Sequence, residues 1–225
     1  LFGGRFLLLK MVIYYIFTVL FIKNLNFKET KKIKYNLWFV SLIVIAIFII
    51  TSLRNWSEVS IIENIVVYFI SPFAFLDILL NDTNINYGVL NGMGTLGFVA
   101  NWVVAFVALL FKTPYSGSDY IITQITAIPR YISPTQSYNA MTTMLYPFIK
   151  DFGFIGIILG TSFLSFLVSS IENLAVKKME LLYICLYVYF IFIILNSVLL
   201  YDLLFPSTFA TIVFLFLFIN KKNIV

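Results

Sequence analysis

Polar side chains gather just ahead of a long apolar run in residues 138–160, YNAMTTMLYPFIKDFGFIGIILG. Asn139, Thr142 and Tyr146 offer hydrogen-bond donors and acceptors, and the carboxylate of Asp151 has the chemistry of a general base or of an acceptor for a sugar hydroxyl. The alternative for Asp151 is a helix N-cap, because a carboxylate just before a helix meets free backbone N–H groups.

A bare helix face follows these polar residues. Gly153, Gly156 and Gly160 recur at spacings of three and four in the apolar run, which we expect to form a helix from Phe152. A face of small residues lets another helix or a ligand approach the backbone closely. Polar groups beside such a face, at a membrane surface, are more typical of a site than of a plain anchor.

Three arginines make up a second candidate set. Arg5, Arg54 and Arg130 all fall on the side of the predicted membrane opposite to the lysines described below. A guanidinium binds phosphate or carboxylate oxygens in pairs and stays charged in a dry site, so we expect these arginines to bind an anionic ligand such as a lipid diphosphate headgroup. The alternative is a contact with lipid phosphates or a salt bridge to an acidic side chain, at Glu58, Glu63, Asp77 or Asp119.

The residue types that are missing narrow the chemistry. The chain has no His and a single Cys, Cys185, which argues against a zinc site, a Cys–His nucleophile and an intrachain disulfide. We predict no metal and no cofactor. Without His, a general base would be an outward-facing carboxylate, at Asp77, Asp151, Glu58 or Glu63.

The composition indicates the fold class. Hydrophobic residues make up 61% of the chain and charged residues 11%, whereas a soluble domain carries roughly a quarter charged residues. This predicts an all-α integral membrane protein, with a single polytopic membrane domain over residues 1–225. The net charge of +5 is therefore interpreted from the positions of the lysines rather than as a sign of nucleic-acid binding. The opening LFGGRFLLLK matches no signal peptide, and we expect the chain to be the back part of a longer protein.

Apolar runs of helix length predict about five transmembrane helices. They are residues 6–22, 36–53, 152–171, 181–201 and 203–220, with Asp202 and Pro206 marking the turn between the last two. If these helices cross alternately, the lysine-bearing segments fall on one side, at 23–34, 177–178 and 221–222. The positive-inside bias makes that side the cytoplasm and places the C-terminus there.

Residues 54–144 form an outward-facing segment within this domain. Its apolar piece 61–80 contains Pro72 and two carboxylates, which favours an interfacial or re-entrant helix over a full crossing. The second piece, 96–111, either crosses or lies in the membrane surface. We favour an outward location for both pieces, because the stretch between them has no Lys or Arg. Glycine and prolines predict a folded loop with turns over 112–137.

Several short pieces of the sequence carry a family resemblance. They are GGR at 3–5 before a crossing, Arg54 after the next crossing, YFISPFAFLD, YGVLNGMGTLGF, and Asn139-x-x-Thr142 followed by Tyr146 and Asp151-Phe-Gly-x-x-Gly156. The last of these is the most specific. In these pieces, which extend over most of its length, the chain resembles the C-terminal half of the bacterial oligosaccharide repeat-unit polymerases, the Wzy-type polymerases of O-antigen and capsular polysaccharide.

This resemblance implies glycosyl transfer on the outer face of the bacterial cytoplasmic (inner) membrane. A glycan carried on one undecaprenyl diphosphate would pass to the sugar end of another, which extends the polymer in blocks. The leaving diphosphate develops negative charge, and fixed arginines stabilise such charge. The implied partners are the undecaprenyl-diphosphate-linked oligosaccharide, the lipid bilayer and other polysaccharide-export proteins, and no nucleic acid.

The candidate residues divide into two groups under this interpretation. We predict Arg54, Arg130 and Asp151 as catalytic residues, with the arginines on the diphosphate and Asp151 on the acceptor. The predicted substrate-binding residues are Arg5, Asn139, Thr142, Tyr146 and Asp77.

Three other functions stay open from the sequence. An O-antigen ligase-like transferase would use similar chemistry but make a single transfer to a different acceptor. A polysaccharide or lipid transporter, or flippase, would place ionisable groups near the middle of the membrane, where only Lys10 comes close. A non-catalytic membrane scaffold is the third.

Overall fold

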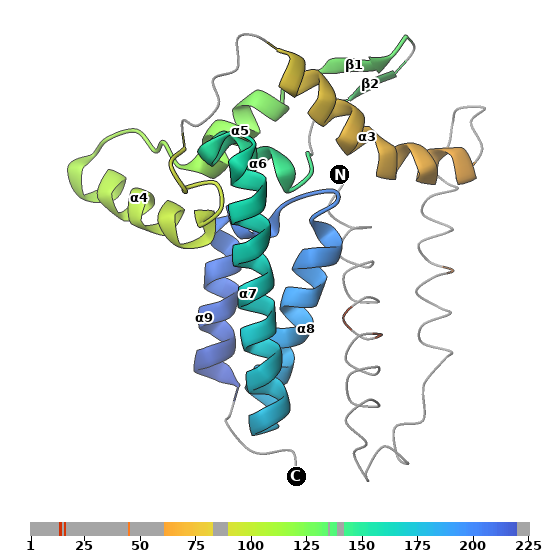
Figure 1. Cartoon of the computed structure of the whole chain (residues 1–225). Coiled ribbons are helices and arrows are strands. Elements are labelled where there is room, and N and C mark those ends of the chain that lie inside the picture. The colour runs from red at the N-terminus through yellow and green to blue at the C-terminus, as the bar shows by residue number, and fades with distance from the viewer. Residues whose placement is uncertain are drawn as a thin grey trace.

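The computed structural model describes residues 61–82, 90–134, 136–138 and 142–219 of the chain, together with Tyr14, Ile16 and Ile45, and it describes 61–68 and 136 by their backbone alone. Within these ranges the chain is mostly helical, which confirms the all-α class, with one short β-hairpin (Figure 1). In chain order the elements are α3 (Ile61–Asn81), α4 (Gly97–Phe111), α5 (Ser118–Thr126), β1 (Arg130–Ser133), β2 (Gln136–Tyr138), α6 (Leu145–Phe152), α7 (Ile155–Lys178), α8 (Leu181–Asn196), the 3-10 helix η2 (Asp202–Leu204) and α9 (Pro206–Phe218).

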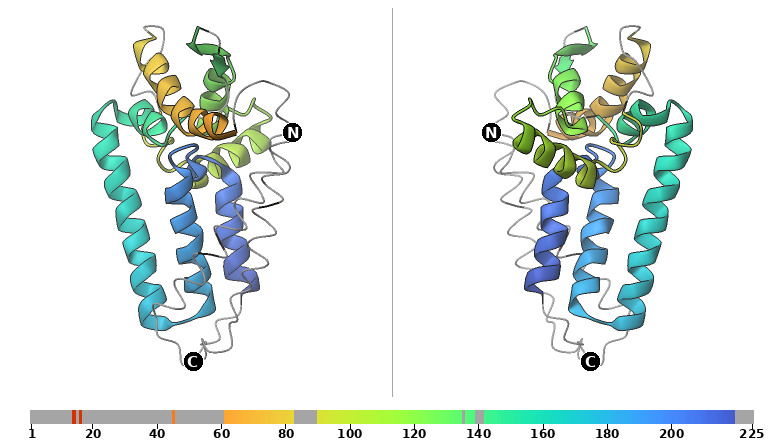
Figure 2. Two further views of the ribbon diagram at one scale, coloured as in Figure 1. Left: turned by 90° about the vertical axis from the view of Figure 1, so that its right-hand side faces the viewer. Right: turned by 90° about the vertical axis from the view of Figure 1, so that its left-hand side faces the viewer.

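Three apolar helices, α7, α8 and α9, stand side by side and alternate in direction (Figures 1 and 2). α7 has 24 residues and a mean hydropathy of 1.7, so it is long and apolar enough to cross a membrane. α8 and α9 have 16 and 13 residues. At ~1.5 Å per residue they are about 24 and 20 Å long, short of the ~30 Å of a bilayer's hydrocarbon core. The predicted number of five crossings therefore stays a prediction.

Polar groups set the boundaries between α8 and α9. α8 ends at Asn196, whose side-chain amide donates to the Asp202 carboxylate over 2.7 Å. η2 follows after a turn over residues 197–201, and Pro206 begins α9 at a position where its missing N–H costs nothing. The predicted turn at Asp202 and Pro206 is confirmed, but it begins at Ser197, inside the predicted run 181–201.

The first two predicted crossings, 6–22 and 36–53, lie outside the described residues except for Tyr14, Ile16 and Ile45. These three residues are helical. The Tyr14 ring packs on α8, with its centroid 4.9 Å from that of Phe192.

The remaining elements form a cap at the end where α7 and α9 begin, and α3 and α4 lie across the ends of the upright helices (Figures 1 and 2). We use the word cap for residues 61–82, 90–134, 136–138 and 142–152. α3 continues through Pro72 as a helix of 21 residues. α4 matches the predicted piece 96–111 to within one residue.

The segment 112–137, predicted as a loop with turns, contains one helix and a β-hairpin. α5 presents Ile121, Ile122 and Ile125 at helical spacing, and Ile122 is buried in the core. β1 and β2 pair as an antiparallel hairpin across the turn at Pro134, with Arg130 opposite Tyr138. The loop prediction is correct for 112–117 and wrong for α5 and the hairpin, because turn residues separate these short elements without preventing them.

The helix predicted from Phe152 begins at Ile155 as α7, and a separate helix that was not predicted, α6, precedes it. α6 ends at Phe152, and Gly153 follows with φ +64°, a conformation that is cheap for glycine because it has no Cβ. The bare face of α7 holds another helix rather than a ligand. A Cβ on Gly156 would overlap the carbonyl oxygen of Phe148, and one on Gly160 would overlap the Phe148 ring.

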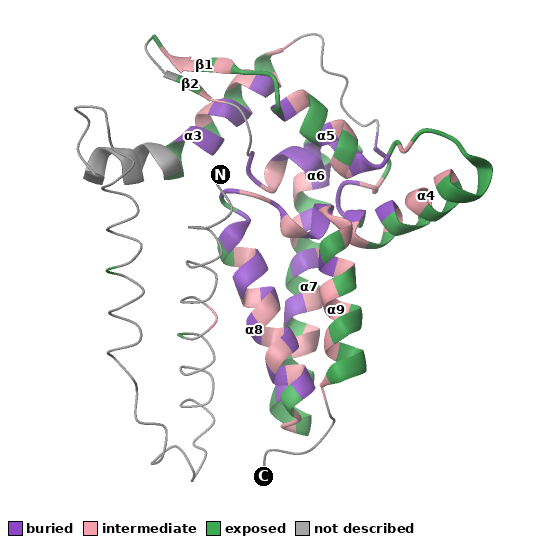
Figure 3. Ribbon diagram, turned by 180° about the vertical axis from the view of Figure 1, so that it is seen from behind, coloured by how far each residue is buried: buried purple, intermediate pink, exposed green. Residues whose placement is uncertain are grey.

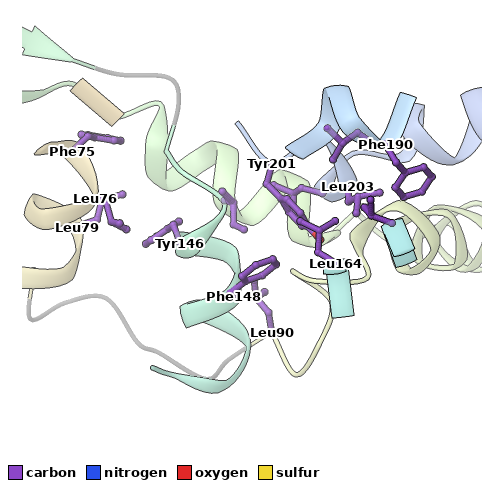
Figure 4. Close-up of a cluster of buried hydrophobic side chains, with 14 residues drawn as sticks. Phe75, Leu76, Leu79, Leu90, Tyr146, Phe148, Leu164, Phe190, Tyr201 and Leu203 are labelled. Atoms are coloured by element: carbon purple, nitrogen blue, oxygen red, sulfur yellow. The ribbon is translucent and has the colours of Figure 1, made fainter. Parts of the chain in front are cut away.

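The hydrophobic core joins the cap to the upright helices (Figure 4). It contains Phe75, Leu76 and Leu79 of α3, Tyr146 and Phe148 of α6, Leu164 of α7, Phe190 of α8, Tyr201 just before η2 and Leu203 within η2. Buried residues concentrate in the cap and along α8, whereas exposed residues lie on α4 and on the outer sides of α7 and α9 (Figure 3). Many of these exposed side chains are large and apolar, for example Phe106, Phe166 and Leu217.

Candidate functional site

Three of the polar side chains predicted at the membrane surface are buried inside the cap. Thr142, Tyr146 and Asp151 are each less than 5% exposed, and so are the neighbouring Thr143 and Lys150. α6 carries most of them and lies between the start of α7 and the turn of residues 90–96. Burial lowers the pKa of the Lys150 ammonium group. These residues are therefore part of the cap interior rather than an open polar surface.

Asp151 holds the turn that leads into α4. Its Oδ1 accepts a hydrogen bond from the backbone N–H of Gly94 over 2.8 Å. Its Oδ2 accepts two hydrogen bonds of 2.6 Å from Thr95, one from the backbone N–H and one from the hydroxyl. The alternative of an N-cap on the following helix is wrong, because α7 begins at Ile155 and has no side-chain cap. The carboxylate instead accepts hydrogen bonds from backbone N–H groups that are far away in the sequence.

Tyr201 completes this arrangement from the connection between α8 and α9. Its hydroxyl donates to the carbonyl oxygen of Thr95 over 3.0 Å. Burial, and to a smaller extent the Asp151 carboxylate, raise the pKa of the Tyr201 hydroxyl, which keeps it protonated and able to donate. We call Gly94, Thr95, Asp151 and Tyr201 the Asp151 clamp. It ties α6, the turn before α4 and the turn before η2 into one unit.

A second buried group, Asn101, connects α4 with its neighbours. Its amide donates to the carbonyl oxygen of Leu204 over 2.7 Å, and its Oδ1 accepts from the backbone N–H of Ser118 over 2.8 Å. The Ser118 hydroxyl also donates to the carbonyl oxygen of Met93 over 2.6 Å. Sequence reasoning missed Asn101, although one amide inside the otherwise apolar run 97–111 is a signal for such a role.

Arg130 lies on β1 and forms an ion pair with Asp82, with 2.7 Å between Nη2 and Oδ2. A salt bridge, which was the alternative to an anionic ligand, is therefore present for Arg130, but its partner is not among the four predicted carboxylates. The Arg130 side chain is 24% exposed, and its Nε is buried without a hydrogen-bond partner among the described residues. The guanidinium thus keeps donor capacity that the ion pair does not use.

Of the other predicted site residues, the structure describes Asp77 and Tyr146, and they lie in different surroundings. Asp77 is exposed on α3 and accepts a hydrogen bond from the Asn81 amide over 3.3 Å. Tyr146 lies in the core between the α3 side chains and Phe148 (Figure 4). Arg5, Arg54 and Asn139 lie outside the described residues, so the predicted group of three arginines stays a prediction.

Thr142 lines a small cavity in the cap, with a volume of about 20 Å³. The cavity is bounded by α5, by the residues at the start of α6 and by the connection between α8 and α9. Its lining residues are Ile122, Thr123, Thr126, Thr142, Pro147, Leu200, Tyr201, Leu204 and Phe205. Thr142 is 4% exposed, and its Oγ1 is buried without a hydrogen-bond partner among the described residues.

Comparison of the chain with protein-family models, with curated proteins and with solved structures finds no match. The functional interpretation therefore depends on the chemistry of the residues and on the resemblance stated from the sequence.

Proposed function

We propose that the chain belongs to a membrane glycosyltransferase that polymerises lipid-linked oligosaccharide repeat units. One observation carries the proposal: an arginine with unused donor capacity, Arg130, lies in a cap at one end of apolar helices. A guanidinium at that position is suited to the diphosphate of a lipid carrier, because the carrier's tail lies in the bilayer and its headgroup lies at the surface. Arg5 and Arg54, the two arginines predicted beside it, would add the positive charge needed to neutralise the diphosphate.

The proposed chemistry needs charge stabilisation and an acceptor hydroxyl in position. Cleavage of the bond between sugar and diphosphate leaves negative charge on the diphosphate, which Arg130 would stabilise. A base must reach the attacking hydroxyl directly, and Asp151, which is 1% exposed and accepts three hydrogen bonds, is poorly placed for that. We therefore propose Asp151 as a positioning residue. Among the predicted general bases whose side chains the structure describes, Asp77 is exposed, so a glycan would be able to reach its carboxylate.

The proposed membrane placement puts the cap outside. The end of α7, with Lys177 and Lys178, and the end of α9 would lie in the cytoplasm. α4 would lie in the surface of the outer leaflet, because its 15 residues carry no charge and expose large apolar side chains while remaining too short to cross. Membrane-impermeant maleimide tests this placement in spheroplasts, with Cys185→Ala as the background. We expect Ser116→Cys, in the exposed loop after α4, to react from outside, and Lys177→Cys to react only after permeabilisation. The reverse pattern would contradict the placement.

Paired substitutions at the ion pair test the role of Arg130. Arg130→Ala is expected to lower the amount of long polymer at least tenfold, since one fixed donor to developing charge commonly contributes that much or more. Arg130→Lys keeps the charge but loses the paired donors, so we expect a partial defect. The measurement is gel analysis of surface polysaccharide from a deletion strain complemented with each full-length variant.

Asp82→Asn is the matched control for this series. It removes the charge of the ion pair but keeps a hydrogen-bond acceptor for Arg130, so the polymer ladder should persist. An equal loss in Arg130→Ala and Asp82→Asn would instead assign Arg130 to joining β1 with the end of α3. A ladder unaffected by deletion of the gene would rule out the polymerase, and a single transfer to another acceptor would indicate a ligase.

A further inference from the structure

The cavity at Thr142 combines a buried hydroxyl with apolar walls. Ile122, Pro147 and Leu204 supply aliphatic surface, and the rings of Tyr201 and Phe205 supply aromatic surface. The hydroxyl of Tyr201 already donates to Thr95, so its contribution to the cavity is apolar. The remaining polar side chains of the lining are those of Thr123, Thr126 and Thr142.

An unsatisfied hydroxyl in such a place indicates a ligand. Thr142 is more than nine-tenths buried, and its Oγ1 has no hydrogen-bond partner among the described residues. A buried hydroxyl without a partner costs free energy, and most buried polar side chains in folded proteins are paired with protein or with a bound group. Thr126 is also buried, and its hydroxyl donates to the Thr123 carbonyl oxygen over a long 3.3 Å. This hydrogen bond is weak, so the hydroxyl is available to a ligand.

The size and charge of the cavity limit what binds there. A volume of about 20 Å³ holds one or two water-sized groups, since one water needs roughly 10–15 Å³ by the same measure. A whole sugar ring does not fit, but one of its substituents does. The lining contains no charged side chain, which disfavours phosphate and carboxylate. Thr123 is exposed at the edge of the cavity, so a substituent is able to enter from the cap surface.

We infer that this cavity, which we call the Thr142 subsite, binds one hydroxymethyl group of a neutral sugar, with its oxygen hydrogen-bonded to Thr142 and its methylene against the apolar wall. The identification of the ligand as a sugar rests on the proposed function. If the protein is a polymerase, the subsite positions the acceptor glycan and contributes to the selection of its sugar. It lies away from the diphosphate proposed at Arg130. Thr142 is a binding residue in this account and takes no part in bond making.

Saturation-transfer NMR on the purified full-length protein in detergent micelles tests the inference. The probes are the methyl glycosides of glucose and galactose, each compared with its 6-deoxy counterpart, which lacks the hydroxyl of the hydroxymethyl group. We expect at least one hydroxymethyl sugar to bind and its 6-deoxy partner to bind about tenfold more weakly, the usual effect of one lost buried hydrogen bond. Absence of binding by all the sugars, with Thr142 holding water only, would overturn the inference.

Three variants make the assignment specific to Thr142. Thr142→Val replaces the hydroxyl by a methyl group of similar size and should remove the preference for the hydroxymethyl sugar, whereas Thr142→Ser should keep it. Thr123→Phe, at the exposed edge, should block binding without altering the buried lining. A thermal melt of each variant checks that it is folded. A preference that survives Thr142→Val in folded protein would contradict the inference.

The outcomes separate this inference from the proposed function. If a sugar binds through Thr142 but the deletion strain makes normal polymer, the subsite stands and the polymerase fails. If the polymer is lost on deletion but no neutral sugar binds, the subsite fails and the polymerase stands.

Discussion

Asp151→Ala is expected to lower the free energy of unfolding by roughly 3 kcal/mol or more, since removal of an acceptor leaves each buried donor with a penalty of about 1–3 kcal/mol. Two backbone N–H groups, of Gly94 and Thr95, would lose their acceptor, together with the Thr95 hydroxyl. The turn before α4 would then keep the hydrogen bonds from Tyr201 and Ser118 to its carbonyl groups and the one from the backbone N–H of Leu90 to Lys150. We expect this variant to show reduced yield and a lower unfolding temperature.

Thermal unfolding of the full-length protein in detergent measures the effect. Thr95→Val removes one of the three donors and should cost about 1 kcal/mol, the net value of a single hydrogen bond. Asp77→Ala, at an exposed carboxylate, is the control for a change of charge and should leave the unfolding temperature near that of the wild type. Asp151→Ala that is as stable as the wild type but inactive would contradict the clamp and return Asp151 to a catalytic role.

Gly156→Ala is expected to cost at least 1–3 kcal/mol, the usual range for overpacking a well-packed interior. The new Cβ would overlap the backbone oxygen of Phe148, which is fixed by α6 and has no rotamer to change. α6 and α7 would have to separate, which would also disturb the Asp151 clamp at the end of α6. The variant should therefore lose stability and polymer together.

Gly160 provides the matched comparison on the same helix face. Its Cβ would overlap the Phe148 ring, and a ring, unlike a backbone oxygen, is removable. Gly160→Ala should destabilise the protein, and adding Phe148→Leu should recover part of the loss, measured as a coupling in a double-mutant cycle. The same second substitution should not rescue Gly156→Ala. Ser162→Ala, at an exposed position of α7, is the neutral control. A neutral Gly156→Ala would show that α6 does not pack on this face.

Local sequence patterns predict the helices well and their ends less well. The apolar run 96–111 coincides with α4 because no residue in it favours a break before Lys112. The run 152–171 begins too early, since hydrophobicity does not register that Gly153 reverses the chain between two helices. The run 181–201 ends too late, because Asn196 forms its hydrogen bond with Asp202, a contact that depends on the turn itself.

The candidate site was harder to predict because its contacts are long-range. Asp151 stands out in the sequence as a carboxylate beside a helix, but its partners Gly94 and Thr95 lie in a distant turn that gives no local sign of needing an acceptor. Arg130 was predicted to meet an anion or a carboxylate, yet the choice of Asp82 depends on how the hairpin packs on the end of α3. The residue types predicted which groups form hydrogen bonds or ion pairs, but the partner of each group depends on tertiary packing.

The most direct test of the proposed polymerase is reconstitution of the full-length protein in liposomes with undecaprenyl-diphosphate-linked repeat units as the sole substrate. We predict a ladder of products in steps of one repeat unit on a gel, together with release of undecaprenyl diphosphate, and loss of both with Arg130→Ala. Folded protein that leaves every repeat unit on its own lipid, under conditions where a known polymerase makes a ladder, would contradict the proposal.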